Sequence, residues 1–167
     1  MAKKATHKGP VGLPLVDRLD GLEPCSLDDY LKGVSEYVLR ARAVSDGARK
    51  AAQVRLSGAL GRALLAELRH RLPDGLRDAF AGEQMVSGAL RAAKADVSEM
   101  HRLDGLRLAV ELKPVNLAVG RAIWNRFGDI RTFAVNLHLK FPFAVVGGVW
   151  SCRRLKRLEA VESPPRT

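Results

Sequence analysis

Cysteine is nearly absent from this chain of 167 residues, which contains only Cys25 and Cys152. Neither residue belongs to a Cys-x-x-Cys pair, and this excludes a disulfide framework and a thiolate metal cluster. Long apolar runs are also lacking, since none reaches the ~18 residues that a membrane-spanning helix needs. The basic N-terminus is not followed by an apolar core of signal-peptide length. We therefore expect a soluble, cytoplasmic protein with no membrane partner.

Acidic residues are scarce relative to basic ones. The chain has 18 Asp and Glu against 28 Lys and Arg, which gives a formal net charge of +10 and a pI near 10.2. Such a balance favours a polyanionic partner, of which nucleic acid is the usual one. A merely soluble basic protein, or one that binds acidic lipid, is the alternative. The hydrophobic content of 47% is ordinary for one domain with a substantial core.

The N-terminal half is predicted to be helical after a flexible start. Residues 1–25 contain several glycines and prolines among scattered lysines, which predicts a flexible basic arm. Ser26, followed three residues later by Asp29, resembles a helix cap, and apolar residues then recur at helical spacing as far as Leu39. A second helix is expected over about 48–72. Residues 26–81 thus form a predicted N-terminal helical region.

The pattern in the second half alternates between helices and strands. A third helix is expected over residues 83–94, followed by extended chain over 97–115. A further helix begins after Asn116 and continues to about residue 140, and the apolar run 143–150 has the length of a buried strand. Alternation of this kind predicts an α/β core over residues 82–150. Residues 151–167 are predicted to form a basic, irregular tail.

The run Leu103–Val115, Leu-Asp-Gly-Leu-Arg-Leu-Ala-Val-Glu-Leu-Lys-Pro-Val, places charged residues in what is otherwise a buried strand. Successive side chains of a strand point to opposite faces, so Glu111 and Lys113 share one face. Pro114 favours extended backbone in the residue before it. A carboxylate and an ammonium group roughly 7 Å apart along a strand can serve one phosphate and its metal ion.

Asp104 together with Glu111-Leu112-Lys113 and the helix and strand that follow resembles the core of the PD-(D/E)XK nuclease superfamily, in particular type II restriction endonucleases. The resemblance covers roughly residues 83–149. It implies a restriction-endonuclease-like core, a small mixed sheet flanked by helices. It also implies that Asp104 and Glu111 bind Mg²⁺, that Lys113 serves the attacking water, and that Glu83, on the preceding helix, is a further metal ligand.

Two features depart from that motif. Leu103 occupies the position of the motif's proline, and only six residues separate Asp104 from Glu111. A straight strand of that length would place the two acids roughly 23 Å apart, so the backbone has to bend between Gly105 and Leu108 if they share a metal. Asp-Gly is also a strong hairpin signal. A hairpin there makes Asp104 a turn residue and makes Asp96 or Glu99 the partner acid.

Polar residues on the predicted helix after the strand are candidates for DNA contact. They are Arg121, Asn125, Arg126 and Arg131. The alternative is that they form a solvated face opposite an apolar stripe. Trp124 and Phe127 belong to that stripe, so they are expected to pack in the core.

These observations predict a Mg²⁺-dependent DNA endonuclease of the restriction type, or a truncated relative of one. Double-stranded DNA is the expected partner, and cutting both strands with one site per subunit favours a homodimer. The main alternative is a DNA-binding protein without catalysis, in which the acid-lysine pair is structural or decayed. A basic protein that binds RNA or ribosomes is a third possibility.

Overall fold

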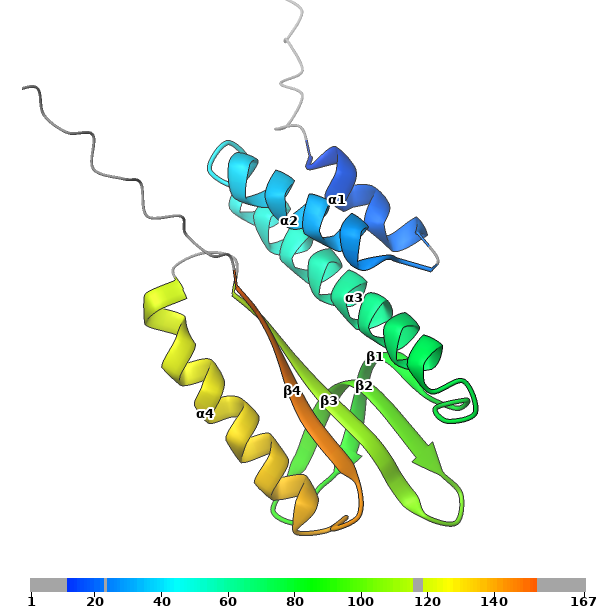
Figure 1. The fold of residues 1–167 in the computed structure, drawn as a ribbon. Coiled ribbons are helices and arrows are strands. Elements are labelled where there is room, and N and C mark those ends of the chain that lie inside the picture. Colours follow the sequence, from blue (N-terminus) through cyan, green and yellow to red (C-terminus); the bar gives the residue numbers. More distant parts are fainter. Residues whose placement is uncertain (1–11, 23, 116–118, 153–167) are drawn as a thin grey trace, which may run out of the picture.

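Helices cover both faces of a four-stranded sheet (Figure 1). The structure is a computed structural model that describes residues 12–22, 24–115 and 119–152. Its elements in chain order are α1 Pro14–Arg18, a 3-10 turn η1 Leu19–Gly21, α2 Leu27–Arg40, α3 Asp46–Arg71, β1 Phe80–Ser87, β2 Ala92–His101, β3 Gly105–Val115, α4 Val119–His138 and β4 Val145–Cys152.

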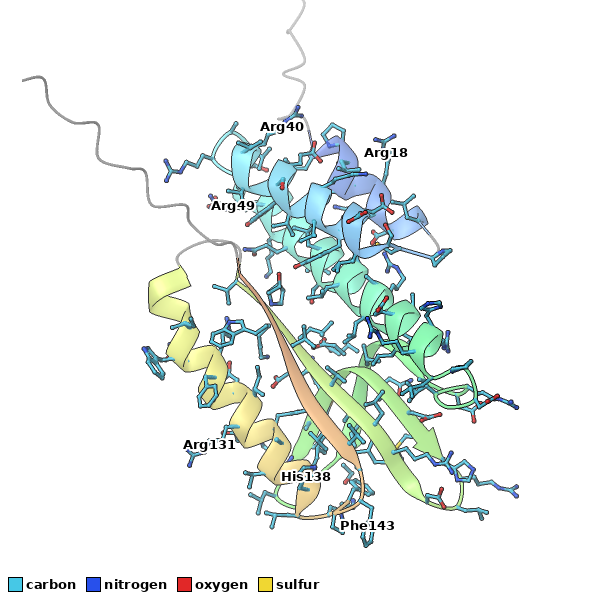
Figure 2. The ribbon with its side chains drawn as sticks, viewed as in Figure 1. Arg18, Arg40, Arg49, Arg131, His138 and Phe143 are labelled. Atoms are coloured by element: carbon cyan, nitrogen blue, oxygen red, sulfur yellow. The ribbon has the colours of Figure 1, made fainter. Side chains whose placement is uncertain are left out.

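The strands have the order β1-β2-β3-β4. The first three form an antiparallel meander, and β4 is parallel to β3 because α4 crosses over between them. The expected mixed α/β class with a small mixed sheet is therefore confirmed. Side chains labelled in Figure 2 show that exposed arginines come from both helical layers: Arg18 and Arg40 from the N-terminal helices, and Arg131 from α4.

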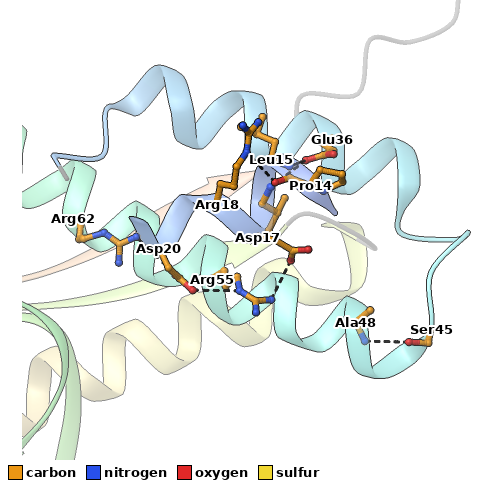
Figure 3. Close-up of polar contacts among 11 residues, drawn as sticks. Pro14, Leu15, Asp17, Arg18, Asp20, Glu36, Ser45, Ala48, Arg55 and Arg62 are labelled. Carbon is orange, nitrogen blue, oxygen red and sulfur yellow. Dashed lines mark hydrogen bonds and ion pairs between the residues drawn. The ribbon is translucent and has the colours of Figure 1, made fainter. Parts of the chain in front are cut away.

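The segment 12–22 is not the flexible arm that the sequence predicts. It forms α1 and η1, and Leu13, Val16 and Leu19 are buried. Glu36 on α2 accepts hydrogen bonds from the amides of Leu15 (2.9 Å) and Val16, which satisfies two donors at the start of α1 (Figure 3). Glycine and proline here shape a short packed turn. Residues 1–11 lie outside the described part of the chain.

The predicted helices α2 and α3 are confirmed, each with a serine cap. Ser26 accepts from the Asp29 amide and Ser45 from the Ala48 amide, as expected for N-cap hydroxyls. Arg55 on α3 forms ion pairs of 3.2 Å with both Asp17 and Asp20, and this pairing ties the first segment to the long helix (Figure 3).

Residues 80–101 differ most from the prediction. The helix expected over 83–94 is wrong: the segment is a hairpin of β1 and β2. Asn136 on α4 holds the connection. Its Oδ1 accepts from the amides of Leu90 (2.8 Å) and Arg91 (3.2 Å), and its Nδ2 donates to the Arg91 carbonyl. The local preference of the alanines in this segment for helix is therefore overridden by tertiary contacts, among them those of the buried Asn136 side chain.

The core has two parts, one on each face of the sheet. The larger part joins the N-terminal helices to Val97, Leu108, Val110 and Leu112. The smaller part lies under α4 and includes Phe133 and Leu137. The larger part contains residues both from the predicted helical region 26–81 and from strands β2 and β3, so the helical region and the sheet share one apolar core.

Candidate functional site

Strand β3 divides its side chains between the two faces. Leu108, Val110 and Leu112 belong to the core beneath α3, whereas Ala109 belongs to the core beneath α4. Glu111 and Lys113 continue the alternation on the α4 side, as the sequence predicts. Lys113 Nζ lies 2.6 Å from Glu111 Oε1, and both side chains are largely buried, with exposed fractions of 21% and 14%.

One carboxylate oxygen of Glu111 has no partner. Glu111 Oε2 is buried and makes no hydrogen bond within the described residues. A buried carboxylate oxygen without a donor is costly, because its water shell has been removed without replacement. Glu111 Oε2 is therefore an oxygen that can accept a cation or a hydrogen-bond donor.

Asp96 supplies a second carboxylate from the neighbouring strand, next in sequence to Val97, which pairs with Val110. Its Oδ2 accepts from the Leu112 amide at 2.6 Å, so this carboxyl group takes the place of a backbone acceptor where the β2–β3 ladder ends at Val97 and Val110. Ala95 packs on the α4 side and Val97 on the α3 side, although residues two apart normally share a face. Strand β2 is thus irregular at Asp96.

The charges around Asp96 act in opposing directions. Burial raises the pKa of the Asp96 carboxyl above its usual value, and the nearby Glu83 carboxylate adds to the rise. The Leu112 amide and the ammonium groups of Lys113 and Lys94 act against it. Asp96 is therefore a partly buried acid that shares one electrostatic environment with Lys113.

The predicted position of Asp104 beside Glu111 is wrong. Strand β3 spans Gly105–Val115, and an irregularity does occur between residues 105 and 108, since Leu106 pairs with Met100 and Leu108 with Glu99. This bulge nevertheless leaves Asp104 outside the strand. His101 pairs with Gly105, which adopts φ +74°, so Asp104 lies in the hairpin loop. There it binds Arg107, and this hydrogen bond lowers the pKa of the exposed Asp104 carboxyl.

The hairpin alternative of the sequence describes the geometry better, and of its two acids Asp96 lies nearer to Glu111 along the β2–β3 ladder. Glu99 is buried but pairs with Leu108, nearer the hairpin loop than Glu111. Glu83 lies on strand β1 rather than on a helix, where it pairs with Lys94. It shares a small cavity with Asp96 on the α3 side, and no contact of Glu83 with Glu111 is observed among the described residues.

An open cavity of about 780 Å³ lies between the sheet and α4, with Glu111 and Lys113 in its wall. Arg91 and Lys94 come from the β1–β2 hairpin, and Asn125 and Asp129 come from α4. The cavity is therefore wide and lined by charges of both signs. A segment of a large polyanion fits this chemistry better than an apolar ligand does.

The four predicted DNA-contact residues of α4 lie in different places. Asn125 lines the cavity, and Arg126 pairs with Asp129 at its rim (3.0 Å). Arg131 projects away from the sheet (Figure 2). The side chain of Arg121 lies outside the described part. Trp124 and Phe127 are not core residues as predicted, since 77% and 52% of their surface is exposed.

The sequence prediction missed Arg91, Lys94 and Asn136. Arg91 and Lys94 lie in the segment 83–94 that was predicted to be helical. Asn136 contacts that segment from α4. If the segment were a helix, Arg91 and Lys94 would be expected on its solvated face. In the structure they lie on the β1–β2 hairpin and line the cavity. A period-two reading of Glu83 to Ser87 could have indicated the strand, but nothing local indicates that Asn136 binds the turn.

The oxygen donors of the site fit a hard divalent cation that takes few of its ligands from the protein. Among the described residues no three His, Cys, Asp or Glu side chains converge to hold a metal by themselves. Mg²⁺, however, is commonly held by one or two carboxylates and fills its other positions with water and phosphate oxygens. Asp96 and the unpartnered Oε2 of Glu111 are the oxygens that would hold it.

No family model matches the chain, and no curated protein or solved structure is significantly similar to it. Within the described ranges, none of the helices combines the length and the apolar character needed to cross a membrane.

Proposed function

We propose that the protein is a Mg²⁺-dependent DNA endonuclease of the restriction type, which hydrolyses phosphodiester bonds at the Asp96–Glu111–Lys113 cluster. The observation that carries the proposal is the buried, unpartnered carboxylate oxygen of Glu111, whose other oxygen binds Lys113. The resemblance to the PD-(D/E)XK superfamily through Glu111-Leu112-Lys113 supports it. The proposed fold is the restriction-endonuclease-like form of the mixed α/β class.

Each side chain has a separate task in this proposal. Mg²⁺, when bound, neutralises the phosphate and lowers the pKa of a water. Glu111 and Asp96 hold the ion, and the Leu112 amide keeps the Asp96 carboxyl in place. Lys113 lies on the same face as Glu111 and either orients the water or stabilises charge that develops on the phosphate.

The cavity wall supplies the substrate side of the proposal. Arg91 and Lys94 offer cations to the phosphates next to the reacting one, and Asn125 offers an amide from α4. A basic chain with a charge of +10 adds a sequence-independent attraction for duplex DNA. The proposed substrate is therefore double-stranded DNA, cut by a homodimer with one site in each copy.

The decisive experiment compares two aspartates of this chain. Supercoiled plasmid is incubated with Mg²⁺ and the wild type, Asp96→Asn or Asp104→Asn. If Asp96 is the ligand, Asp96→Asn loses about 100-fold or more in rate, as expected when a metal-holding group is removed, and Asp104→Asn stays close to the wild type. The opposite ranking would return the role to Asp104 and reject the site described above.

Glu111→Gln and Lys113→Met complete the series. Both should abolish Mg²⁺-dependent cleavage while leaving the far-UV circular dichroism spectrum unchanged. Calorimetric titration with Mg²⁺ separates the two roles, because only Glu111→Gln should lose heat of metal binding. Cleavage that survives both substitutions, or that persists in EDTA, would refute the proposed function.

A non-catalytic DNA-binding protein is the second candidate, and the 2.6 Å ion pair between Lys113 and Glu111 favours it. A pair this close can serve as a structural bridge that satisfies both charges. In that case DNA affinity falls steeply with salt but does not respond to EDTA. No Mg²⁺-dependent cleavage is observed, and Glu111→Gln lowers the stability of the fold.

A further inference from the structure

The two edges of the sheet are built differently. At one edge, β1 has an irregular register between Ala81 and Gln84 and carries the charged Glu83. Irregularities and charges of this kind prevent pairing with another strand. At the other edge, β4 pairs with β3 in an unbroken register from Val145 to Cys152. Among the described residues, the β1 edge of the sheet is therefore protected against a further strand and the β4 edge is not.

Strand β4 has the properties of an incomplete edge. Its sequence, Val-Val-Gly-Gly-Val-Trp-Ser-Cys, contains no charge and no proline. Within residues 12–22, 24–115 and 119–152, no strand covers its outer side. Val145 is 66% exposed, and Phe143, just before the strand, is 98% exposed. A long, apolar, unprotected edge of this type is a template for strand addition.

A groove beside β4 offers space for the side chains of an added strand. It has a volume of about 390 Å³ and lies on the α3 side of the sheet. Its wall is mostly apolar. It includes Leu60 and Leu64 of α3, Cys25 in the segment before α2, and Val149 of β4. Alternate residues of a strand paired with β4 would point toward this groove, and the others toward the α4 side.

Two occupants are available from this chain. Residues 153–167 follow β4 directly, but they begin with Arg153, Arg154, Lys156 and Arg157. Placing these cations against an apolar groove would cost their hydration. Strand β4 of a second copy instead brings uncharged residues, and those that share a face with Val149 on the α3 side are Val145 and Gly147.

We propose that β4 pairs with β4 of a second copy, so that two four-stranded sheets join into one. A two-fold axis normal to the sheet reverses the strand direction, so the new pair is antiparallel. Because the β1 edge is protected, the assembly closes as a dimer and does not extend into a fibre. The positive charge of both copies opposes association, so added salt strengthens the dimer.

This pairing leaves the two α4 layers on the same side of the joined sheet. If the proposed nuclease function holds, both cavities then face one duplex. The dimer itself does not depend on that function, since none of the residues that form the edge belongs to the Asp96–Glu111–Lys113 cluster.

The test measures the oligomeric state of the full chain by sedimentation velocity over a range of protein and salt concentrations. The wild type should dimerise, more tightly at higher salt. The double variant Val145→Lys/Trp150→Lys should raise the dissociation constant about tenfold or more, because it places charge in the interface. Leu103→Lys is the matched control, since Leu103 is an exposed apolar residue at the β2–β3 hairpin, away from the β4 edge, and it should behave as the wild type.

Hydrogen exchange of the wild type gives a reading that does not depend on how the variants fold. Amides of residues 145–152 should become better protected as the protein concentration rises, while those of β1 should not change. A wild type that stays monomeric, a dimer that survives the double variant, or β4 protection that ignores concentration would each overturn the proposal. Loss of DNA cleavage with the dimer intact would reject only the nuclease function.

Discussion

The two faces of the sheet use the same strands for different purposes. On the α3 side, β3 contributes three large apolar residues to a core that also contains Leu56 and Tyr30. On the α4 side, the same strand contributes Leu106 and Ala109 to a smaller core, and then two charges beside an open cavity. The comparison shows how a buried ion pair is tolerated in a small domain, because the opposite face anchors the strand.

The difference is also one of solvent access. Leu56 is fully buried, whereas Trp124 on α4 is mostly exposed. Helix α3 approaches the sheet at Gly61, where an added Cβ atom would lie 3.4 Å from Leu112 Cδ1 and 3.8 Å from the Asp96 carbonyl oxygen. Helix α4 covers its face only in part and leaves space at Glu111. The larger apolar core thus lies on the α3 face of the sheet, and the cavity with Glu111 and Lys113 lies on the α4 face.

The largest expected effect comes from the α3 face. Leu56→Ala should lower the free energy of unfolding by roughly 3 kcal/mol, because it removes buried methyl groups and leaves a cavity. Urea unfolding measures the loss. Val54→Ala, on the same helix but 66% exposed, is the control and should change stability by less than about 0.5 kcal/mol. Equal losses at the two positions would break the comparison.

A smaller loss is expected from the link between the faces. Asn136→Ala should cost about 1–3 kcal/mol, because it leaves the backbone groups of Leu90 and Arg91 without their partner. Hydrogen exchange should show the opening at the β1–β2 hairpin first. Asn125→Ala, a solvated neighbour on α4, should leave that exchange unchanged. If both variants behave alike, α4 does not hold the hairpin as described.

Asp96→Asn should stabilise the protein at neutral pH in metal-free buffer. The pKa of the folded Asp96 carboxyl is raised, so the folded state holds its proton more tightly than the unfolded state. The contribution of Asp96 is therefore favourable below the unfolded pKa and is lost as pH rises through the folded pKa. The Asn amide keeps an acceptor for Leu112 but removes the ionisation.

Chemical denaturation from acidic to neutral pH tests this sign. Asp104 supplies the opposite case, because its pKa is lowered by Arg107 and its small contribution is lost as pH falls. Asp96→Asn should flatten the decline toward neutral pH, whereas Asp104→Asn should not. A destabilised Asp96→Asn protein at neutral pH would show that the carboxylate is better solvated than its burial implies.

The smallest effect belongs to the outer surface of α4. Trp124→Ala should change the free energy of unfolding by no more than about 0.5 kcal/mol, since the ring is mostly in water. Thermal unfolding is sufficient to detect a larger change. A loss comparable to that of Leu56→Ala would mean that Trp124 is covered in solution.

Local signals in the sequence predicted a good part of this fold. Ser26 and the apolar periods identified α2 and α3, and the alternation around Glu111 identified β3 and the face that its charges share. The β1–β2 hairpin escaped prediction because its turn depends on Asn136, which is distant in the sequence. Asp96 was found only as an alternative, since its position depends on the strand register.

The shared core also determines the order in which the chain can complete its structure during synthesis. Helix α3 leaves the ribosome well before Val97, Val110 and Leu112, the strand residues on which its apolar face packs. Until β3 has been made, that face has no permanent partner. The apolar face of α3 therefore stays accessible to chaperones and to other nascent chains until β3, the strand that also carries Glu111 and Lys113, has been synthesised.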